Sequence, residues 1–171
     1  RPGTTTSVVT TSTVAPASPF PPAGPPTPEP PADPPAPTTE PPSPRPVAAP
    51  GSDAVALVNS IRTAAGLPPL AETEALHRAA QAHSLDQASM QSMTHIGSDG
   101  TDAGARVVRS GFDAVAWAES LAAGYDVADA AIAGWMAPGG QDRANILDPA
   151  FTAIGLAAAE AGDGTVYWTM L

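Results

Sequence analysis

Proline is distributed very unevenly along this chain, with 18 of the 22 prolines in residues 1–50 and four beyond them. The same 50 residues contain one aromatic side chain, Phe20, and 13 serines or threonines. Such a segment buries too little apolar surface to offset the entropy lost on ordering. We therefore expect a disordered, partly polyproline II spacer over residues 1–50 and one folded domain over residues 51–171.

The predicted domain is acidic. It holds five arginines, no lysine and 14 acidic residues, a net charge of five minus 14, or −9. This charge disfavours nucleic acid and anionic membranes as partners. No apolar run is long enough to span a bilayer, and the chain contains no cysteine. Together with the Pro- and Thr-rich spacer, which is typical of secreted or wall-associated stalks, this composition predicts an extracytoplasmic protein whose signal peptide or anchor has been removed.

Apolar residues at helical spacing predict two helices at the start of the domain. The first follows Asp53 and ends at Gly66. Thr73 is a suitable N-cap for a second helix over residues 74–92. Its buried stripe is expected to contain Leu76, Ala79, Ala80, His83 and Met90.

The three histidines differ in their surroundings. His83 lies on the apolar stripe, which favours a hydrogen-bonded core histidine over a ligand to a metal. His77 is expected in solvent beside Arg78. His95 belongs to no periodic pattern and follows the second helix in a glycine-bounded loop, so it is the histidine that we expect to face a cleft.

The remaining patterns alternate between helix and strand. Asp102 is expected to cap a short helix that Gly111 closes, and a further helix opens at Asp126, with Val127, Ala131 and Trp135 on one face. Residues 114–121 alternate as in a strand, and residues 152–160 and 165–171 form a hairpin around a Gly-Asp-Gly turn. Helices packed on antiparallel strands make the class α+β.

Two polar features stand out against this framework. Glu119 shares the predicted strand face with Trp117, so it is either satisfied by backbone donors or lines a polar cleft. The segment 141–149 presents Asp142, Arg143 and Asn145 above two aliphatic residues and ends at an Asp-Pro turn. It suits either the rim of a cleft or a capped turn between two elements.

The order of these motifs resembles a known family. The motifs are Ala-Gly-Leu-Pro-Pro-Leu, Ala-Ala-Gln-Ala-His-Ser, Thr-His-Ile-Gly-Ser-Asp-Gly, Ala-Glu-Ser-Leu-Ala-Ala-Gly-Tyr, Gly-Trp-Met, Arg-Ala-Asn-Ile-Leu-Asp-Pro-Ala-Phe-Thr-Ala-Ile-Gly and Tyr-Trp-Thr. Residues 53–171 are thereby similar to the bacterial, SCP-like branch of the CAP superfamily, which groups cysteine-rich secretory proteins, antigen 5 and pathogenesis-related proteins. The resemblance implies a secreted, three-layer α-β-α sandwich with a central antiparallel sheet.

The resemblance also implies a cleft with two histidines and two acids, which binds a divalent metal such as zinc in some members. His95 matches the first histidine and Glu119 the acid of Gly-Glu-Asn. The second histidine is replaced by Asp142, and the second acid, expected three residues after Trp135, is replaced by Pro138. Arg143, Asn145 and Trp135 are then structural parts of the cleft.

This incomplete tetrad changes the metal chemistry that the cleft supports. One histidine with two carboxylates, His95, Glu119 and Asp142, forms a harder and weaker ligand set than a two-histidine zinc site. It suits calcium, magnesium or manganese, or no metal, so we expect no resident cofactor.

Two functions follow from these observations. The first is a non-catalytic binding module of the cell envelope with a degenerate cleft, whose partner is an envelope component or a small apolar ligand. The alternative is a metal-assisted or acid-base hydrolase, peptidase-like, in which His95, Glu119 and Asp142 act together. No activated nucleophile is evident, which favours the module over the enzyme. The sequence indicates no oligomeric state.

Overall fold

The computed structural model describes residues 42–47 and 51–171, so most of the predicted spacer lies outside the described residues. The helices are α1 (Gly51–Ala64), α2 (Glu74–Met90), α3 (Ala103–Arg109), α4 (Ala128–Trp135) and α5 (Gln141–Leu147). The strands are β1 (Arg45–Pro46), β2 (Ala71–Glu72), β3 (Ser120–Ala123), β4 (Ala153–Ile154), β5 (Leu156–Glu160) and β6 (Val166–Met170). Among these described residues, no helix has the length and apolar character needed to cross a membrane.

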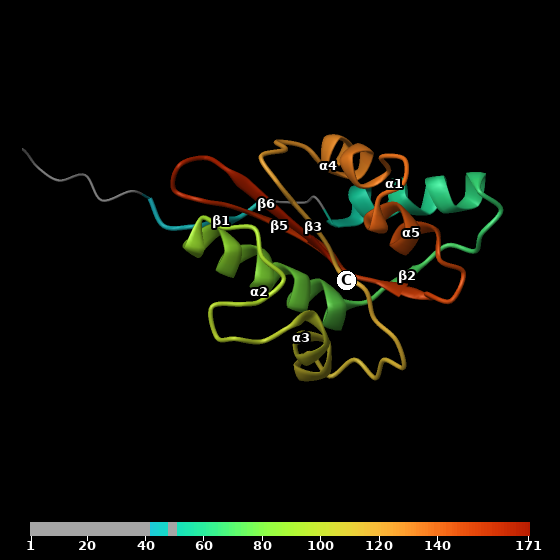
Figure 1. Cartoon of the computed structure of the whole chain (residues 1–171), viewed down its shortest axis with the longest axis horizontal. Helices are drawn as coiled ribbons and strands as arrows, with labels where there is room; N and C mark the ends of the chain where they lie inside the picture. The colour runs from blue at the N-terminus through green and yellow to red at the C-terminus, as the bar shows by residue number, and fades with distance from the viewer. Residues whose placement is uncertain (1–41, 48–50) are drawn as a thin grey trace, which may run out of the picture. The chain divides into compact units, whose positions relative to one another are not determined.

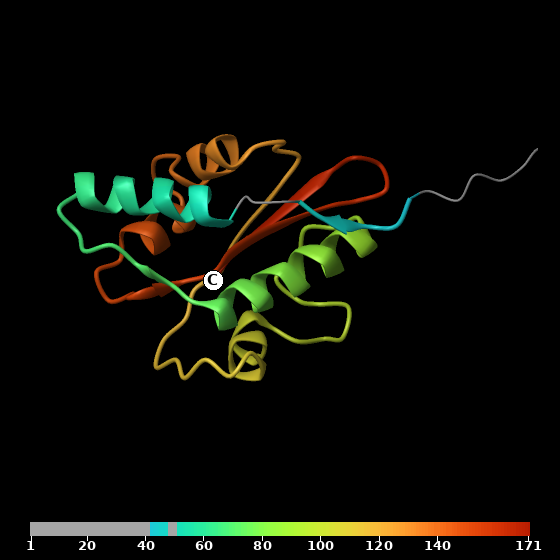
Figure 2. The same ribbon diagram turned by 180° about the vertical axis from the view of Figure 1, so that it is seen from behind.

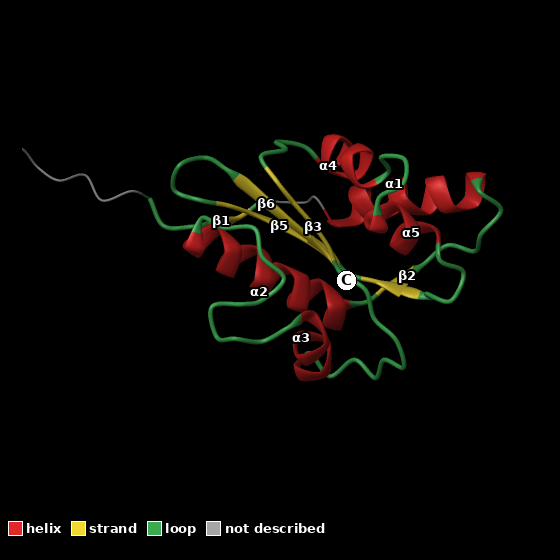
Figure 3. Cartoon of the chain, in the orientation of Figure 1, coloured by secondary structure: helices red, strands yellow, loops and turns green. Residues whose placement is uncertain are grey.

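Four strands form one antiparallel sheet in the order β1-β5-β6-β3. Helices α1, α4 and α5 lie on one side of it and α2 and α3 on the other, as Figures 1 and 3 show and Figure 2 shows from behind. The predicted α+β class and three-layer sandwich are therefore confirmed. A separate parallel pair, β2 with β4, was not predicted.

Alternation along the strands divides the core between the two faces. Leu156, Ala158 and Trp168 point toward α1 and α4 and belong to the larger apolar cluster. Ala159 and Tyr167 point the other way, toward α2. Both faces are covered, which explains why every residue of β6 is buried.

Small side chains allow α2 to lie close to the sheet. Ala157, Ala158 and Ala159 are all fully buried in β5. At Gly155, just before β5, an added Cβ would lie 2.1 Å from the backbone carbon of Leu76 at the start of α2. Only glycine fits this contact, so the start of α2 is fixed against the sheet.

A buried arginine fixes the end of α5. Arg62 of α1 donates to the backbone oxygens of Pro68 (3.0 Å), Ile146 (2.7 Å), Asp148 (2.9 Å) and Phe151 (3.3 Å). The oxygen of Pro68 lies after α1, and the other three lie in the last turn of α5 or after it, where helix carbonyls lack intrahelical donors. Arg62 thus ties α1 to the segment that the sequence placed at a cleft rim.

The sheet extends upstream of residue 51. Arg45 pairs with Glu160 in the antiparallel register and also forms an ion pair with it at 2.6 Å. The amide of Val47 donates to the oxygen of Ala158 at 3.0 Å. The last described residues of the predicted spacer therefore form an edge strand of the domain.

Several local predictions are confirmed. Thr73 caps α2, and Asp102 caps α3 by accepting from the amide of Ala105. Gly111 has a left-handed φ of 83° after α3. The C-terminal hairpin forms from β5 and β6. In each case a short-range signal, a cap or a glycine turn, was sufficient.

Other predictions were wrong. Residues 114–119 form a loop, and the strand begins only at Ser120; Val115, Ala116 and Trp117 are all exposed, so the alternation in the sequence corresponds to no buried face. Val127 is exposed instead of packing with Ala131, since it is the N-cap residue before α4. His77 is half-buried and hydrogen-bonds the oxygen of Leu156 at 2.9 Å. The polar segment from residue 141 is itself a helix, α5.

Candidate functional site

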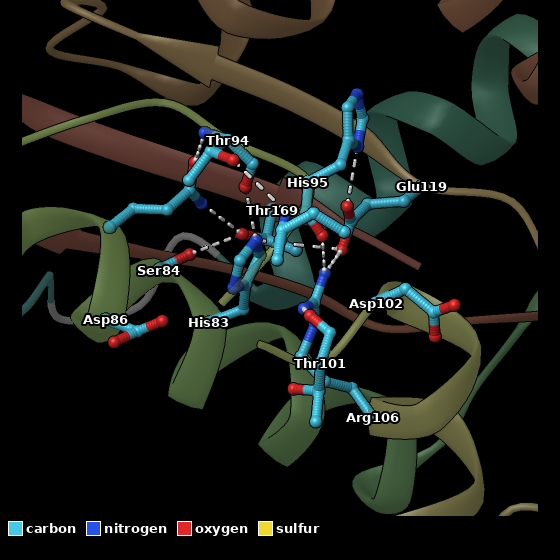
Figure 4. Close-up of polar contacts among 12 residues, drawn as sticks. His83, Ser84, Asp86, Thr94, His95, Thr101, Asp102, Arg106, Glu119 and Thr169 are labelled. Carbon is cyan, nitrogen blue, oxygen red and sulfur yellow. Dashed lines mark hydrogen bonds and ion pairs between the residues drawn. The ribbon is translucent and has the colours of Figure 1, made fainter. Parts of the chain in front are cut away.

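Glu119 is a buried carboxylate at the centre of a polar cluster (Figure 4). The residue is 8% exposed and lies immediately before β3, on the side of the sheet covered by α2 and α3. Its Oε1 accepts from Arg106 Nη2 at 2.6 Å, and its Oε2 accepts from His95 Nδ1 at 2.7 Å. Side chains therefore satisfy both oxygens, and the predicted alternative of backbone donors is not observed.

Arg106 comes from the buried face of α3. Its Nη1 donates to the oxygen of Thr101 at 2.8 Å, and its Nη2 also donates to the oxygen of His95 at 3.0 Å. One guanidinium thus joins α3, the loop carrying His95 and the carboxylate of Glu119. The charge of Arg106 balances that of Glu119, as a buried carboxylate requires.

His95 lies at the surface of this cluster. Its side chain is 66% exposed, whereas that of Glu119 is 2% exposed. Because a carboxylate only accepts, Nδ1 carries the proton in this contact and Nε2 is left with its lone pair when the ring is neutral. Figure 4 shows the ring of His95 extending from Glu119 away from His83 and Arg106. His95 and Glu119, which the resemblance assigned to one cleft, are thus in contact.

His83 lies behind Glu119 as the buried, hydrogen-bonded histidine that its position on the apolar stripe predicted. Its Nε2 lies 2.9 Å from the oxygen of Thr94 and 3.9 Å from Glu119 Oε1. Burial, followed by the positive charge of Arg106, lowers the pKa of His83 below its usual value. The ring is therefore neutral at pH 7, with its proton on Nε2.

A second polar group holds the loop that precedes His95. The amide of Thr94 donates to Gln87 Oε1 at 3.3 Å, and Gln87 Nε2 donates to Thr169 Oγ1 at 3.1 Å. Ser84 Oγ also contacts Thr169 Oγ1, at 3.0 Å. The polar side chains on the buried face of α2 thus fix the loop to β6, and through it the position of His95.

The other residues predicted for the cleft take separate positions. Trp135 is buried and donates from Nε1 to the oxygen of Leu121 at 2.9 Å. Asn145 Nδ2 donates to the backbone oxygen of Glu119 at 3.4 Å, which places α5 beside the site. Arg143 is exposed and contacts the oxygen of Met136 at 3.4 Å. In the part of the chain that the structure describes, no hydrogen bond or ion pair joins Asp142 to His95 or Glu119.

The donor set does not fit a divalent metal. The charge of Glu119 is already balanced by Arg106, whose guanidinium lies 2.6 Å from Oε1 and would repel a cation, and Oε2 faces the Nδ1–H of His95. Within residues 42–47 and 51–171, no three histidine, cysteine or acidic side chains are grouped so as to hold an ion. His95 Nε2 is one ligand, and one imidazole does not make a site.

An apolar cavity of about 150 Å³ lies beside the polar cluster around Glu119. Its wall combines the loop of residues 112–118 with α5, β4 and the end of β6. The apolar side chains around it include Leu76, Val107, Phe112, Phe151, Ile154 and Met170. Ser120 and Asn145 supply polar atoms at the same wall, which places the cavity next to the residues that flank Glu119.

The family model of the cysteine-rich secretory protein (CAP) family matches residues 55–171 of the chain. The chain belongs to this family. The match includes every element from α2 to β6 and confirms the resemblance inferred from the motifs. No curated protein matches the chain.

Three solved bacterial structures are similar to this CAP domain. An extracellular protein containing an SCP domain from Bacillus anthracis has a TM-score of 0.63 and 24% identity, covering 71% of this chain and 40% of that one. An outer surface protein from Borrelia burgdorferi has a TM-score of 0.63 and 14% identity, covering 74% and 94%. A cysteine-rich secretory protein from Staphylococcus aureus has a TM-score of 0.54 and 16% identity, covering 70% and 37%. At these identities the likeness supports the CAP fold, and the chain spans less than half of the first protein.

Sequence reasoning missed the partner of Glu119. Arg106 stands between Ala103 and Val107, which are both buried, at a helical spacing that places it on the inner face of α3. A charged residue on that stripe needs an opposite charge, and Glu119 was the unexplained acid nearby in the sequence. Pairing the two would have identified the centre of this CAP domain's site.

Proposed function

We propose that this CAP domain is an extracytoplasmic, non-catalytic binding module that takes a small apolar ligand in the cavity beneath the loop of residues 112–118. The single observation that carries the proposal is the cavity itself, about 150 Å³ with mainly apolar walls. An apolar cavity of about that size is known to take a benzene-sized molecule, and this one is open to solvent on one side. A ring or a short alkyl chain is the matching ligand.

The loop that covers the cavity supports this role. Trp117 is 51% exposed and Val115 is fully exposed, although both also line the cavity. Exposed aromatic and aliphatic side chains beside an apolar cavity suit the entry of an apolar molecule. The ligand is not expected to be an anion, because the domain carries a net charge of −9.

The pairing of Glu119 with Arg106 supports a binding module rather than an enzyme. Glu119 is neutralised by Arg106, so it is not a free general base, and the donors around it do not fit a metal. The extracytoplasmic location is supported by two similar structures, one described as extracellular and the other as an outer surface protein.

The test is a titration of the full chain with 1-octanol, followed by the methyl NMR signals of Leu76, Val107, Ile154 and Met170. All four residues line the cavity. The proposal expects saturable shifts at these methyls. It is contradicted if the methyls stay unchanged up to the solubility limit of octanol, or if exposed residues of α4 respond equally.

Two alanine substitutions provide a matched pair for this titration. Ala118 lines the cavity, whereas Ala133 is exposed on α4. Ala118→Leu fills the space and is expected to weaken octanol binding about tenfold, or 1.4 kcal/mol. Ala133→Leu is expected to leave it unchanged.

One observation favours a second function, an acid-base hydrolase. The 2.7 Å contact between His95 Nδ1 and Glu119 orients an exposed imidazole with its Nε2 lone pair outward. In that function His95 would take a proton from water at Nε2, and Arg106 and Glu119 would hold the ring in position. Turnover of a peptide substrate that His95→Ala abolishes would support it, whereas equal rates in parent and variant would exclude it.

A further inference from the structure

Asp113 carries the only charged side chain among the described residues that line the apolar cavity. It lies in the loop of residues 112–118 together with Val115 and Trp117, and all three residues are exposed. Leu76 and Val107, which also line the cavity, are buried. Exposed residues of a cavity wall lie at its mouth, so Asp113 stands where a bound molecule would meet solvent.

No cation balances Asp113. In residues 42–47 and 51–171, none of the ion pairs includes this carboxylate. The exposed Asp99, by contrast, is paired with Arg109 at 2.6 Å. No arginine or histidine of the described chain lines the cavity either. The negative charge at the mouth is therefore left for solvent or a ligand to balance.

The main polar groups elsewhere in the wall are uncharged and are bonded within the protein. Asn145 Nδ2 donates to Ser120 Oγ at 3.3 Å, and Asn145 Oδ1 accepts from Gln141 Nε2 at 3.0 Å. The inside of the cavity thus offers a ligand mainly apolar contacts. A molecule that matches both regions has an apolar body and one positive group at its end.

Trp117 is a second feature of the mouth that favours a cation. Its indole is exposed and belongs to the cavity wall. The face of an indole attracts ammonium groups more strongly than that of any other aromatic side chain. An ammonium group at the mouth is therefore attracted by the carboxylate of Asp113 and by the ring of Trp117.

The attraction to Asp113 does not depend on one hydrogen-bond geometry. Coulombic energy falls only with the inverse of distance, and an aspartate side chain is too short to move its charge far from the wall that its residue lines. The net charge of −9 acts in the same direction. Because Asp113 is exposed, water weakens the interaction, and a preference of about threefold in dissociation constant is expected at low salt.

We propose that the apolar cavity selects a cationic amphiphile, a primary alkylamine or arylalkylamine whose apolar part fills the cavity and whose ammonium group lies at the mouth near Asp113 and Trp117. This inference rests on the proposed function, since it names the charge of the ligand that the binding module takes. Neutral molecules bind through the apolar part alone, and carboxylates of the same length are repelled.

The experiment compares octylammonium, 1-octanol and octanoate, three probes that share one alkyl chain, in titrations of the full chain at pH 7 and low salt. At this pH the amine is cationic and the carboxylic acid anionic. Dissociation constants come from the methyl signals of Leu76, Val107, Ile154 and Met170, which line the cavity. Octylammonium is expected to bind about threefold more tightly than 1-octanol, and octanoate most weakly.

The outcomes separate this inference from the proposed function. If 1-octanol binds at least as tightly as octylammonium, the preference for a cation is overturned while the apolar binding module stands. If none of the three probes binds, both fail. Methylammonium has no alkyl chain to fill the cavity and is expected to leave the four methyl signals unchanged; binding as tight as that of octylammonium would overturn the assignment to the cavity.

Two aspartates provide matched variants. Asp113 lines the cavity, whereas Asp129 is an exposed acid of α4 that does not. Each substitution by asparagine removes one negative charge from the domain. Asp113→Asn is expected to bring the dissociation constants of octylammonium and 1-octanol together, and Asp129→Asn to leave their ratio at about threefold. An equal loss of preference in both variants would show that the net charge selects the cation, and would overturn the role given to Asp113.

Discussion

Arg106 Nη2 lies 2.6 Å from Glu119 Oε1, and the two side chains are only 9% and 2% exposed. This buried ion pair joins α3 to the residue before β3. Burying two charges costs desolvation energy, which the pair recovers only while both partners are present. The ion pair therefore determines how much the free energy of unfolding changes when Arg106, Glu119 or both are substituted.

Removing the cation alone leaves Glu119 buried and unpaired. Arg106→Met is expected to lower the free energy of unfolding by about 3–5 kcal/mol, measured by urea denaturation at pH 7. Arg109→Met removes an exposed cation from the same helix and is expected to cost less than about 1 kcal/mol.

The double variant separates charge from packing. Arg106→Met combined with Glu119→Leu removes both charges and is expected to recover more than half of the loss, because no unpaired charge remains. A single variant as stable as the parent, or a double variant no more stable than the single one, contradicts the role given to this ion pair.

The buried, neutral His83 predicts a pH dependence of stability. Its pKa is lowered in the folded state, so below about pH 6.5 the unfolded chain binds more protons than the folded one. The contribution is fully present above that pH and is lost as the pH falls toward the folded pKa. Urea midpoints at pH 7.5 and 5.5 should differ more for the parent than for His83→Gln, since the shared contribution of other groups cancels. Equal differences would argue against a neutral His83.

Trp117 packs directly on Gly104 of α3. A Cβ at Gly104 would lie 2.8 Å from Trp117 Nε1 and 2.9 Å from its ring. Gly104→Ala is expected to displace the indole and shift its fluorescence to longer wavelength, while the helix gains about 1 kcal/mol in propensity. Trp135 and Trp168 are buried, and subtracting the spectrum of Trp117→Phe isolates the change. An unchanged emission maximum would exclude this packing.

Arg62 supports α5 through backbone oxygens. Arg62→Met removes donors from the oxygens of Pro68, Ile146, Asp148 and Phe151. One of the four hydrogen bonds is buried and three are part-buried, where water can replace the lost donor, so a loss on the order of 3 kcal/mol is expected in urea unfolding. Hydrogen exchange in α5 should rise more than exchange in α3. A uniform change across both helices would contradict a local role.

The sequence predicted most of the fold because its strongest signals are local. The periodicity of α1 and α2, the caps at Thr73 and Asp102, and the glycine-bounded hairpin each act within a few residues. The strand prediction was wrong at residues 114–119, which alternate in the sequence but form a loop. The segment from residue 141 was interpreted as a cleft rim or a turn because of its polar residues, but it forms the helix α5.

The site was less predictable, since it depends on contacts between distant residues. The resemblance assigned His95 and Glu119 to one cleft but left open whether they meet, and it did not indicate that the partner that neutralises Glu119 is Arg106, 13 residues away on another element. Whether an acid is free or paired is decided by packing, which periodicity does not describe. The catalytic and metal-binding roles of His95, Glu119 and Asp142 stay predictions.

Calorimetric zinc titration of the full chain, beside His95→Ala and Glu119→Gln, shows whether the neutralised Glu119 and the exposed His95 bind a metal. Because Arg106 balances the charge of Glu119 from 2.6 Å and would repel a cation, the parent is expected to give no more heat than either variant. Stoichiometric zinc binding by the parent that both substitutions abolish would show that the cleft is a working metal site, and would contradict the account of a neutralised acid in a binding module.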